Sequence, residues 1–473
     1  MSGTMLETGK REAGRWLRLG LRAARGAGGD PTQGPVLDAI VMLAVPMVLE
    51  MVMESVFAVV DIFFVSRLGP EAVAGVALTE AALTLVYTVA MGLSIGVTAM
   101  VARRIGERAP DAAGEATGQA ILIAAVAATA IGVIGALHAD GILRLMGGDD
   151  AVVAAGGSYA TIMLATNAVI LLLFLLNAAF RGAGDAAIAM RVLWLANGIN
   201  ILLDPLLIFG PGPFPELGVA GAAVATSIGR GVGVAFQLTV LLGGAGRLRV
   251  MARHLVPRRA VMARLIRLSA SGTLQVFIAT ASWIGLVRIL AGFGPEALAG
   301  YTIAIRVVLF ALLPAWGLAN AAATMVGQGL GAGDPARAER SVWIAGLMNL
   351  VFLGSVGAVF MVAAPVIIAL FGGDAATADH AVRALRIISA GFLFYAWGMV
   401  LTQSFNGAGD TWTPTVLNLL CFWMWEIPLA YALARGVGLG PDGVYAAIAI
   451  AYATVAIASA VLFRRGRWKM AVV

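Results

Sequence analysis

Long apolar runs recur along the whole chain, and short stretches of glycine, proline and charged residues separate them. A bilayer core about 30 Å thick requires roughly 20 predominantly apolar residues in each helix that crosses it. Twelve runs reach this length, at residues 37–65, 72–102, 118–137, 152–180, 192–209, 217–242, 265–293, 297–326, 342–371, 385–405, 416–433 and 444–463. The pattern predicts an all-α membrane protein with twelve transmembrane helices.

The composition supports this class and excludes several others. Hydrophobic residues make up 60% of the 473 positions, charged residues only 12%, and the mean hydropathy is +0.92. A soluble domain carries about a quarter charged residues. One cysteine and three scattered histidines offer no metal-ligand spacing, and no phosphate-binding G-x-x-x-x-G-K-[ST] run occurs. We therefore expect a protein that is not an enzyme, with no cofactor.

Basic residues gather on one side of the predicted spans. Most lysines and arginines fall in the N-terminal tail, in the loops after even-numbered spans and in the C-terminal tail. The positive-inside rule then places both termini in the cytoplasm, in a multi-pass protein of the inner (cytoplasmic) membrane. The net charge of +6 is explained by this orientation and by contact with membrane lipid, so we expect no nucleic-acid partner.

Self-comparison reveals an internal repeat with an offset of 225 residues: GPEA at 69–72 returns at 294–297, and GAGD at 182–185 returns at 407–410. Each half holds six spans, so the two halves are parallel repeats, a plan typical of transporters with a cavity between the halves. The predicted organisation is a cytoplasmic tail (1–36), an N-terminal six-helix lobe (37–243), a basic cytoplasmic linker (244–264), a C-terminal six-helix lobe (265–463) and a cytoplasmic tail (464–473).

Apart from Asp38 at the very start of the first span, six acidic residues lie inside predicted spans, where an ionisable group costs at least about 2.5 kcal/mol on insertion scales. They are Glu50, Glu54, Asp61, Glu80, Asp204 and Glu426. A helix turns by about 100° per residue, which places the first three on one stripe of the first span. That stripe must face a cavity or a partner. Because five of the six acids lie in the first half, we expect the ion chemistry in the N-terminal lobe.

The fifth span carries a second acidic pattern. Asn200 and Asp204 share one helix face because they are four residues apart, and Pro205 tends to kink the helix beside the carboxylate. Thr226 adds an oxygen from the sixth span. Carboxylates that share a low-dielectric pocket can take up and release a proton near neutral pH, and the same oxygens could hold Na⁺. The alternative is that Arg230 or backbone groups simply neutralise these acids.

Two further sets of residues are candidates for function. Glu80 and Arg306 occupy nearly equivalent positions in the two halves, which suggests a gate pair across the lobe interface. Alternatively, each snorkels towards water from within its own span. Tyr395 and Trp397 offer aromatic faces that suit cationic or flat drugs, so they are candidates for the substrate cavity, with lipid-facing packing as the alternative.

The motifs that remain are specific when taken together. They are Pro46, VDIFFVSRLG at 60–69, FRGAGD at 180–185, NILLDPL at 200–206 and GAAVAT at 221–226. On these residues the chain resembles the MATE (multidrug and toxic compound extrusion) family from Pro46 to the last span. The resemblance implies a twelve-helix antiporter with two lobes, which exports drugs or metabolites against an inward flow of H⁺ or Na⁺.

The resemblance is closest to the prokaryotic DinF-type branch of that family. In that branch the coupling site corresponds here to Asp61, Asn200, Asp204 and Thr226. Ala279 and Tyr395 stand where the NorM-type branch uses acids, which argues against the latter branch. Glu54 replaces a frequent glutamine and Glu50 is an additional acid, so both are candidate accessory acids that either raise the affinity for the ion or bind a cationic substrate.

Together the residues and the resemblance predict a secondary active multidrug exporter. It would exchange small amphipathic or cationic organic compounds for H⁺ or Na⁺ by alternating access, and we expect drug-like substrates and a monomer. No metal is expected, unless Na⁺ occupies the coupling site. The alternative function is that of a flippase of the same superfamily for a lipid-linked oligosaccharide. A flippase requires a strongly basic cavity for pyrophosphate, whereas only Arg230 and Arg306 lie more than five residues inside a predicted span.

Overall fold

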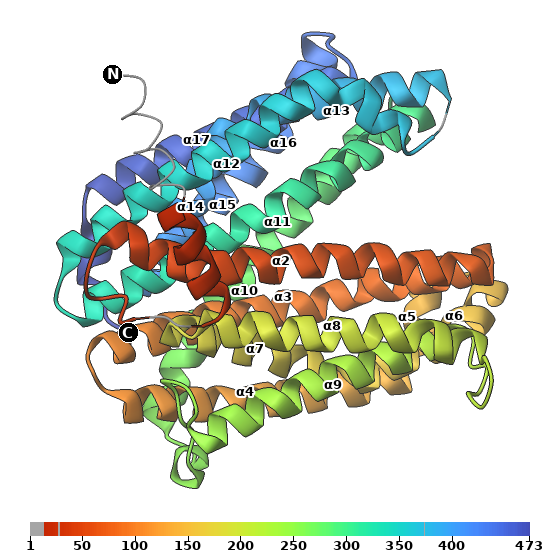
Figure 1. Cartoon of the computed structure of the whole chain (residues 1–473). Helices are drawn as coiled ribbons and strands as arrows, with labels where there is room; N and C mark the ends of the chain where they lie inside the picture. Colours follow the sequence, from red (N-terminus) through yellow and green to blue (C-terminus); the bar gives the residue numbers. More distant parts are fainter. Residues whose placement is uncertain (1–13, 27–28, 373) are drawn as a thin grey trace.

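The computed structural model describes residues 14–26, 29–372 and 374–473 (Figure 1). The described residues form helices and connecting turns, with no strand among them. Ten helices are long and apolar enough to cross a membrane, and two bent pairs of shorter helices bring the crossings to as many as twelve. The predicted class, an all-α membrane protein, is confirmed. The predicted tail at 1–36 lies partly outside the described residues.

The first lobe begins at α2, and its helices run roughly parallel to one another in Figure 1. Its elements are α2 (Val36–Val65), η1 (Ser66–Leu68), α3 (Pro70–Gly106), α4 (Pro110–Leu137), α5 (Ala139–Leu145), α6 (Asp150–Ala165), α7 (Asn167–Ala183), α8 (Ala186–Phe209) and α9 (Val219–Gly243). One continuous apolar core joins α3, α4, α6, α7, α8 and α9.

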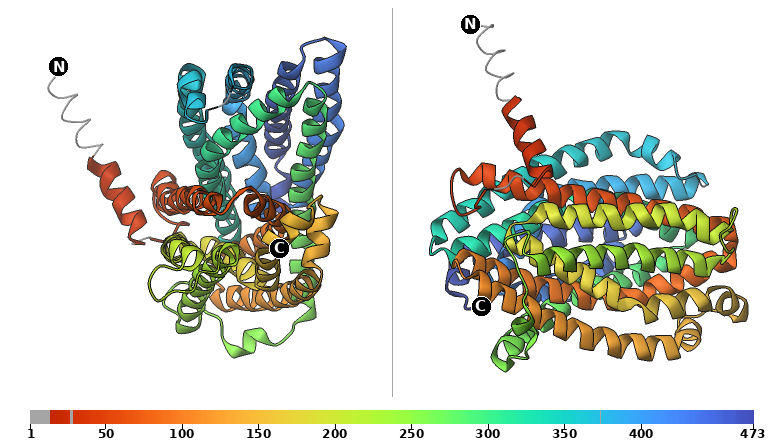
Figure 2. Two further views of the ribbon diagram at one scale, coloured as in Figure 1. Left: turned by 90° about the vertical axis from the view of Figure 1, so that its right-hand side faces the viewer. Right: turned by 60° about the horizontal axis from the view of Figure 1, so that its bottom comes forward.

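The second lobe repeats this order. Its elements are α10 (Arg259–Ala291), α11 (Pro295–Gly331), α12 (Pro335–Ala369), α13 (Ala375–Ala390), α14 (Phe392–Ala408), α15 (Trp412–Asn418), η3 (Leu419–Glu426), α16 (Ile427–Tyr431), η4 (Ala432–Gly436), α17 (Pro441–Arg464) and η5 (Arg467–Met470). Figure 2 shows the two lobes end-on as two bundles. Between them, residues 244–258 hold the short turn η2 (Ala252–Leu255), and α10 begins within the predicted linker.

The structure reproduces the internal repeat at matching points of the two lobes. The fourth crossing bends by 47° between α6 and α7, at Thr166, and the tenth bends by 55° between α13 and α14, at Gly391. These two positions are separated by the repeat offset of 225 residues. Gly184 and Gly409, also equivalent, end α7 and α14 with φ values of 89° and 90°, a left-handed conformation that glycine adopts without a steric penalty.

The lobes cross each other in two equivalent contacts. In one, Gly92 of α3 lies against the backbone of Thr273 in α10; in the other, Gly317 of α11 lies against the backbone of Met47 in α2. A Cβ atom at either glycine would collide with the facing backbone. Glycine therefore lets the helices approach as closely as small residues do in other membrane bundles.

The end of the molecule that carries the start of α2 and the C-terminus is closed by a second symmetric set of contacts. Gly106 of α3 packs on the backbone of Gln328, and Gly331 of α11 packs on the backbone of Arg103. The Arg103 guanidinium donates to the Ala408 carbonyl at 3.3 Å, and the Gln328 amide donates to the Gly182 carbonyl at 2.8 Å. Towards the opposite end the lobes diverge in Figure 1.

Candidate functional site

A cavity of about 300 Å³ lies between the lobes, and we call it the inter-lobe cavity. Residues from α2, α3, α7 and α8 line one side of it, and residues from α10, α11 and α14 line the other. Its polar lining consists mainly of Glu50, Glu54, Tyr87, Asn177, Arg181, Asn320, Gln403 and Asn406. The stripe of acids predicted along the first span therefore faces a cavity through Glu50 and Glu54.

Glu50 is 1% exposed and forms a buried ion pair. Arg181 of α7 donates to Glu50 Oε1 at 2.7 Å, and the Asn177 amide donates to the same oxygen at 3.1 Å. Gln237 of α9 in turn donates to Asn177 at 2.6 Å. Glu50 Oε2 is buried without a hydrogen-bond partner among the described residues, so one acceptor remains available in the cavity.

Glu54 and Arg230 approach the cavity from different helices. The Asn197 amide of α8 donates to Glu54 Oε2 at 3.1 Å. Arg230 of α9 lies between the rings of Phe57 and Tyr87 and donates to the Tyr87 hydroxyl at 3.0 Å. In the described part of the chain, the salt bridges include none between Arg230 and an acid. Direct pairing with Arg230 is therefore not what balances the charge of these acids.

The predicted coupling residues come together on α2, α8 and α9, which pack against one another. The Asn200 amide donates to the Thr226 hydroxyl at 2.8 Å. Asp204 is fully buried, and both of its carboxylate oxygens lack a partner among the described groups. The carbonyl oxygen of Asn200 and Asp61 Oδ1 are likewise buried and unpartnered, and the Asp61 and Asp204 carboxylates lie close enough to interact electrostatically.

This cluster has the donor set of a site for a small cation. Four buried oxygens without hydrogen-bond donors are an unfavourable arrangement for an empty protein interior. They can be satisfied by a proton shared among carboxylates or by an ion such as Na⁺, which takes oxygen ligands. Pro205 follows Asp204 inside α8 and leaves one backbone carbonyl of the preceding turn without its usual donor.

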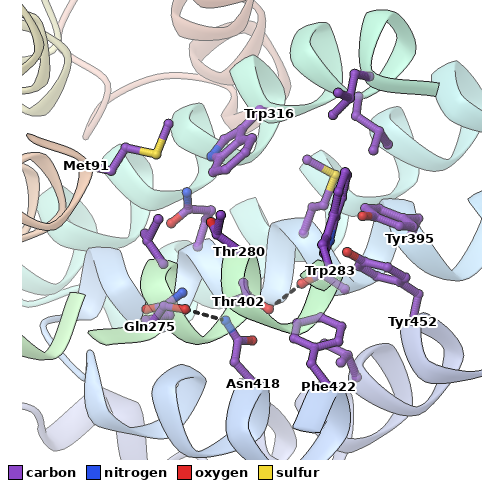
Figure 3. Close-up of a pocket in the computed structure, with 18 of the residues that line it drawn as sticks. Met91, Gln275, Thr280, Trp283, Trp316, Tyr395, Thr402, Asn418, Phe422 and Tyr452 are labelled. Carbon is purple, nitrogen blue, oxygen red and sulfur yellow. Dashed lines mark hydrogen bonds between the residues drawn. The ribbon is translucent and has the colours of Figure 1, made fainter. Parts of the chain in front are cut away.

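The second large cavity lies inside the C-terminal lobe and measures about 360 Å³ (Figure 3). We call it the C-lobe cavity. Met91, Val276, Leu313, Trp316 and Gln403 line both cavities, so the two are neighbouring compartments of one space. None of the described residues that line the C-lobe cavity is charged; its main side chains are Trp283, Trp316, Tyr395, Phe422 and Tyr452.

The two aromatic residues predicted for a substrate cavity divide between two environments. Tyr395 lines the C-lobe cavity, and its ring stacks on Tyr452 with a centroid distance of 3.5 Å. Trp397 points towards α12 instead, with its ring 5.6 Å from that of Trp343 and against Gly346. The prediction for Trp397 is therefore wrong. Trp397 follows Tyr395 by two residues, or about 200° around the helix, so the two side chains face opposite sides of α14.

Glu80 and Arg306 are not joined in this conformation. The Tyr159 hydroxyl donates to Glu80 Oε1 at 3.0 Å within the first lobe, whereas Arg306 on α11 is exposed. Both residues lie nearer the end where the lobes diverge. A gate contact in a conformation that is closed at that end stays a prediction.

Arg181 lines the inter-lobe cavity, and the sequence pattern did not single it out as a candidate. Its position next to the turn at 182–185 suggested a loop outside the membrane, but α7 extends to Ala183 and directs Arg181 into the cavity. Its spacing of four residues from Asn177 is the signal that could have revealed it, because residues four apart share a helix face. Trp283 and Tyr452 were missed for lack of any local motif.

Two parallel repeats of helices around a shared cavity, with acids buried in the membrane-spanning region, define a transporter rather than an enzyme. The MatE family model matches residues 46–206 and 273–432, two stretches of nearly equal length that begin 227 residues apart. These matches cover more than half of the chain, which therefore belongs to the MatE (MATE) family. The predicted family is confirmed, and so is the prediction that the protein is a transporter.

Individual relatives agree with this assignment. The chain is 24% identical over 431 residues to the probable multidrug resistance protein NorM of Thermotoga maritima, across 91% of this chain and 92% of that one. It is 25% identical over 304 residues to a FAD transporter of Shewanella oneidensis, across 63% of this chain and 66% of that one. Membership of the DinF-type branch stays a prediction.

A solved structure of a multidrug resistance MATE family transporter of the MOP superfamily, described as outward-facing, superimposes with a TM-score of 0.86 at 26% identity. The match covers 95% of this chain and 98% of that chain. The chain is thus a multi-span membrane protein with the two-lobed MATE fold, and its relatives support multidrug transport.

Proposed function

We propose that this protein is a secondary active exporter, which exchanges small amphipathic or cationic organic compounds for H⁺ or Na⁺ by alternating access. The observation that carries the proposal is Asp204, a fully buried carboxylate with no partner on either oxygen in the described chain. Removing an ionised carboxylate from water costs several kcal/mol unless a counter-charge is present. A proton or a cation supplies that charge, so the occupancy of the site depends on the ion gradient.

The coupling site and the substrate cavity share one helix. Asp61 lies on α2, which packs against the Asp204 helix α8, and two to three turns earlier α2 presents Glu50 and Glu54 to the inter-lobe cavity. Neutralising Asp61 and Asp204 changes how α2 packs on α8, and this change reaches the cavity through Glu54 and its donor Asn197. Occupancy of the ion site and the shape of the cavity are therefore linked mechanically.

The cavity fits a compound with an apolar aromatic part and a positive charge. The inter-lobe cavity offers the free oxygen of Glu50 and the Glu54 carboxylate, while the adjoining C-lobe cavity offers aromatic faces. Cations bind favourably over such faces. Among the described residues that line the inter-lobe cavity, Arg181 is the one arginine, and it is already paired with Glu50. A pyrophosphate headgroup therefore gains little there, and the flippase alternative is less well supported.

The expected orientation fits export. With both termini in the cytoplasm, the closed end made by Gly106 and Gly331 faces the cytoplasm, and the conformation described is open to the outside. Inward movement of each coupling charge then contributes about 2.3 kcal/mol per 100 mV of membrane potential.

The test is efflux of ethidium from proteoliposomes under a pH gradient and, separately, under a Na⁺ gradient. We expect one gradient to drive efflux, and we expect Asp204→Asn to reduce that efflux to background. Glu216→Gln, an exposed acid in the loop after α8, is the matched control and should transport normally. Full gradient-driven efflux by Asp204→Asn would overturn the role of the site, and no efflux under either gradient would overturn the exporter function.

A further inference from the structure

Glu426 is a buried acid that the coupling site of the first lobe does not use. It lies in η3 of the eleventh crossing and is 2% exposed. Within the described chain, the salt bridges and hydrogen bonds include none to its carboxylate. The helix around it is a π-helix over Leu419–Glu426, and such wide turns occur often at functional sites.

The carboxylate of Glu426 faces a small closed space among tyrosines. A cavity of about 10 Å³ is lined by Tyr301 of α11, Tyr395 of α14 and Tyr452 of α17, with Trp283 of α10 and aliphatic side chains completing it. A space of this size holds one water molecule. An organic ion or a hydrated metal ion does not fit there, whereas a proton on Glu426 needs no space of its own.

The space beside Glu426 is lined by residues of α10, α11, α13, α14 and α17. The titratable side chains that face Glu426 are Tyr301, Tyr395, Tyr452 and, on its own helix, Cys421. Helices α10 and α13 contribute only Trp283, Leu286 and Ile388. No described lysine or arginine lines this space. Because no neighbouring basic side chain holds Glu426 in its charged form, the charge of Glu426 responds mainly to a ligand that binds nearby.

The small space shares a wall with the C-lobe cavity. Trp283, Tyr395 and Tyr452 line both, and Figure 3 shows these three side chains grouped on one side of the larger cavity, away from Met91 and Trp316. Since no described residue lining the C-lobe cavity is charged, a cation bound there has Glu426, one aromatic layer away, as its nearest acid in this lobe.

We propose that Glu426 is the exchangeable counter-charge of the C-lobe cavity: it is protonated while the cavity is empty and releases its proton when a lipophilic organic cation binds against Trp283, Tyr395 and Tyr452. The O–H bond of the carboxyl group breaks, the proton passes through the single-water space to solvent, and the carboxylate balances the incoming positive charge. One positive charge enters the lobe as one leaves it. This proposal rests on the proposed export of organic cations.

The direct test is proton release on ligand binding by the purified full-length protein in weakly buffered detergent solution with a pH indicator dye. Tetraphenylphosphonium is the probe because its charge is permanent, so any proton released comes from the protein. Asp61→Asn combined with Asp204→Asn is the background, which removes release from the proposed coupling site. We expect this background to release protons on binding and the further substitution Glu426→Gln to abolish that release. Unchanged release after Glu426→Gln overturns the proposal.

The affinity of the protein for a cationic ligand, compared with a neutral one, provides a second readout. A purely structural role of Glu426 would not change this ratio. Glu426→Gln should raise the Kd for tetraphenylphosphonium about tenfold, while the Kd for the neutral, similarly shaped triphenylphosphine oxide should stay within about twofold. Glu426→Asp keeps the acid and should keep both proton release and selectivity for the cation. If Glu426→Gln fails to fold, Glu426→Asp and Tyr452→Phe carry the test: loss of proton release in Glu426→Asp contradicts the proposal.

Measurements of binding and of transport also distinguish the proposed exporter function from the proposed role of Glu426. If gradient-driven efflux is absent while tetraphenylphosphonium still displaces a proton from Glu426, the proposed function fails and the site stands. If efflux is present and Glu426→Gln leaves both proton release and affinity unchanged, the exporter stands and the proposed role of Glu426 fails.

Discussion

The two lobes share one backbone plan but present different chemistry to the cavity between them. Glu50 and Arg181 form an ion pair in the first lobe, and the residues at their equivalent positions in the second are Gln275 and Asn406. The residue 225 positions after the buried acid Asp204 is Leu429. The first lobe thus places its buried charges on a regular α-helix and in a fixed ion pair, whereas the second surrounds one lone acid with aromatic rings.

The eleventh crossing shows what this difference does to local structure. Its counterpart α8 is an α-helix of 24 residues with Pro205 next to Asp204. The eleventh crossing instead passes from α15 into two π-helical stretches around α16, with Pro428 shortly after Glu426. The repeat therefore constrains the order and bends of the helices, while each lobe sets the chemistry and winding of its own cavity wall.

The largest expected effect is on coupling in the first lobe. Asp204→Asn, in the vesicle experiment described above, should abolish gradient-driven efflux because the site loses its charge. Leu429→Asn, the same amide at the equivalent position of the second lobe, should leave most efflux intact. Equal loss from both substitutions would remove the functional difference between the lobes.

The next effect is on stability and concerns the ion pair of the first lobe. Arg181→Asn leaves Glu50 buried and uncompensated and should destabilise the protein by about 3–5 kcal/mol, the cost of breaking a buried pair. Adding Glu50→Gln gives the first lobe the same two residue types that the second lobe has at the equivalent positions, Gln275 and Asn406. This double variant should regain most of the lost stability. Thermal unfolding of the purified variants, followed by intrinsic tryptophan fluorescence, measures this; a double variant as unstable as Arg181→Asn would contradict it.

A third prediction tests the symmetric contacts. Gly92→Val and Gly317→Val should each weaken the crossing of the lobes by a similar amount, about 1–3 kcal/mol as for other overpacked sites. Spin labels placed on α3 and α11 near the closed end report the separation of the lobes, with Gly141→Val, at a glycine with open space around it, as the control. A shift in the label distances for one glycine variant alone would show that the two crossings are not equivalent.

The smallest effect concerns Met91 and Trp316, equivalent residues that line both cavities. Trp316→Met, which makes the two positions alike, removes a cation–π contact worth about 0.5–2 kcal/mol. We expect a several-fold higher Kd for ethidium in a fluorescence titration. Met91→Leu is the control and should bind as the wild type does; an unchanged Kd for Trp316→Met would place the dye elsewhere.

Sequence reasoning succeeded where a pattern is repeated or local. The turns at 69–72 and 294–297 predicted matching helix starts, and the four-residue spacing of Asn200 and Asp204 predicted a shared face that the structure joins to Thr226. It failed where the outcome depends on contacts between distant segments. The ion pair of Glu50 with Arg181 joins α2 to α7, and the π-helical stretch that ends at Glu426 packs against α10 and α17. Neither contact has a signature in the local sequence.

The paired glycine contacts also have an evolutionary consequence. A six-span unit that meets a parallel copy of itself through the same residues on both sides has the geometry of an isologous dimer. In such a dimer every substitution appears twice, so an acid acquired in one cavity wall would face its own duplicate. Joining the two copies into a single chain removes this constraint. Asp204 and Leu429 could then diverge independently, and the asymmetry of the present molecule became available to selection.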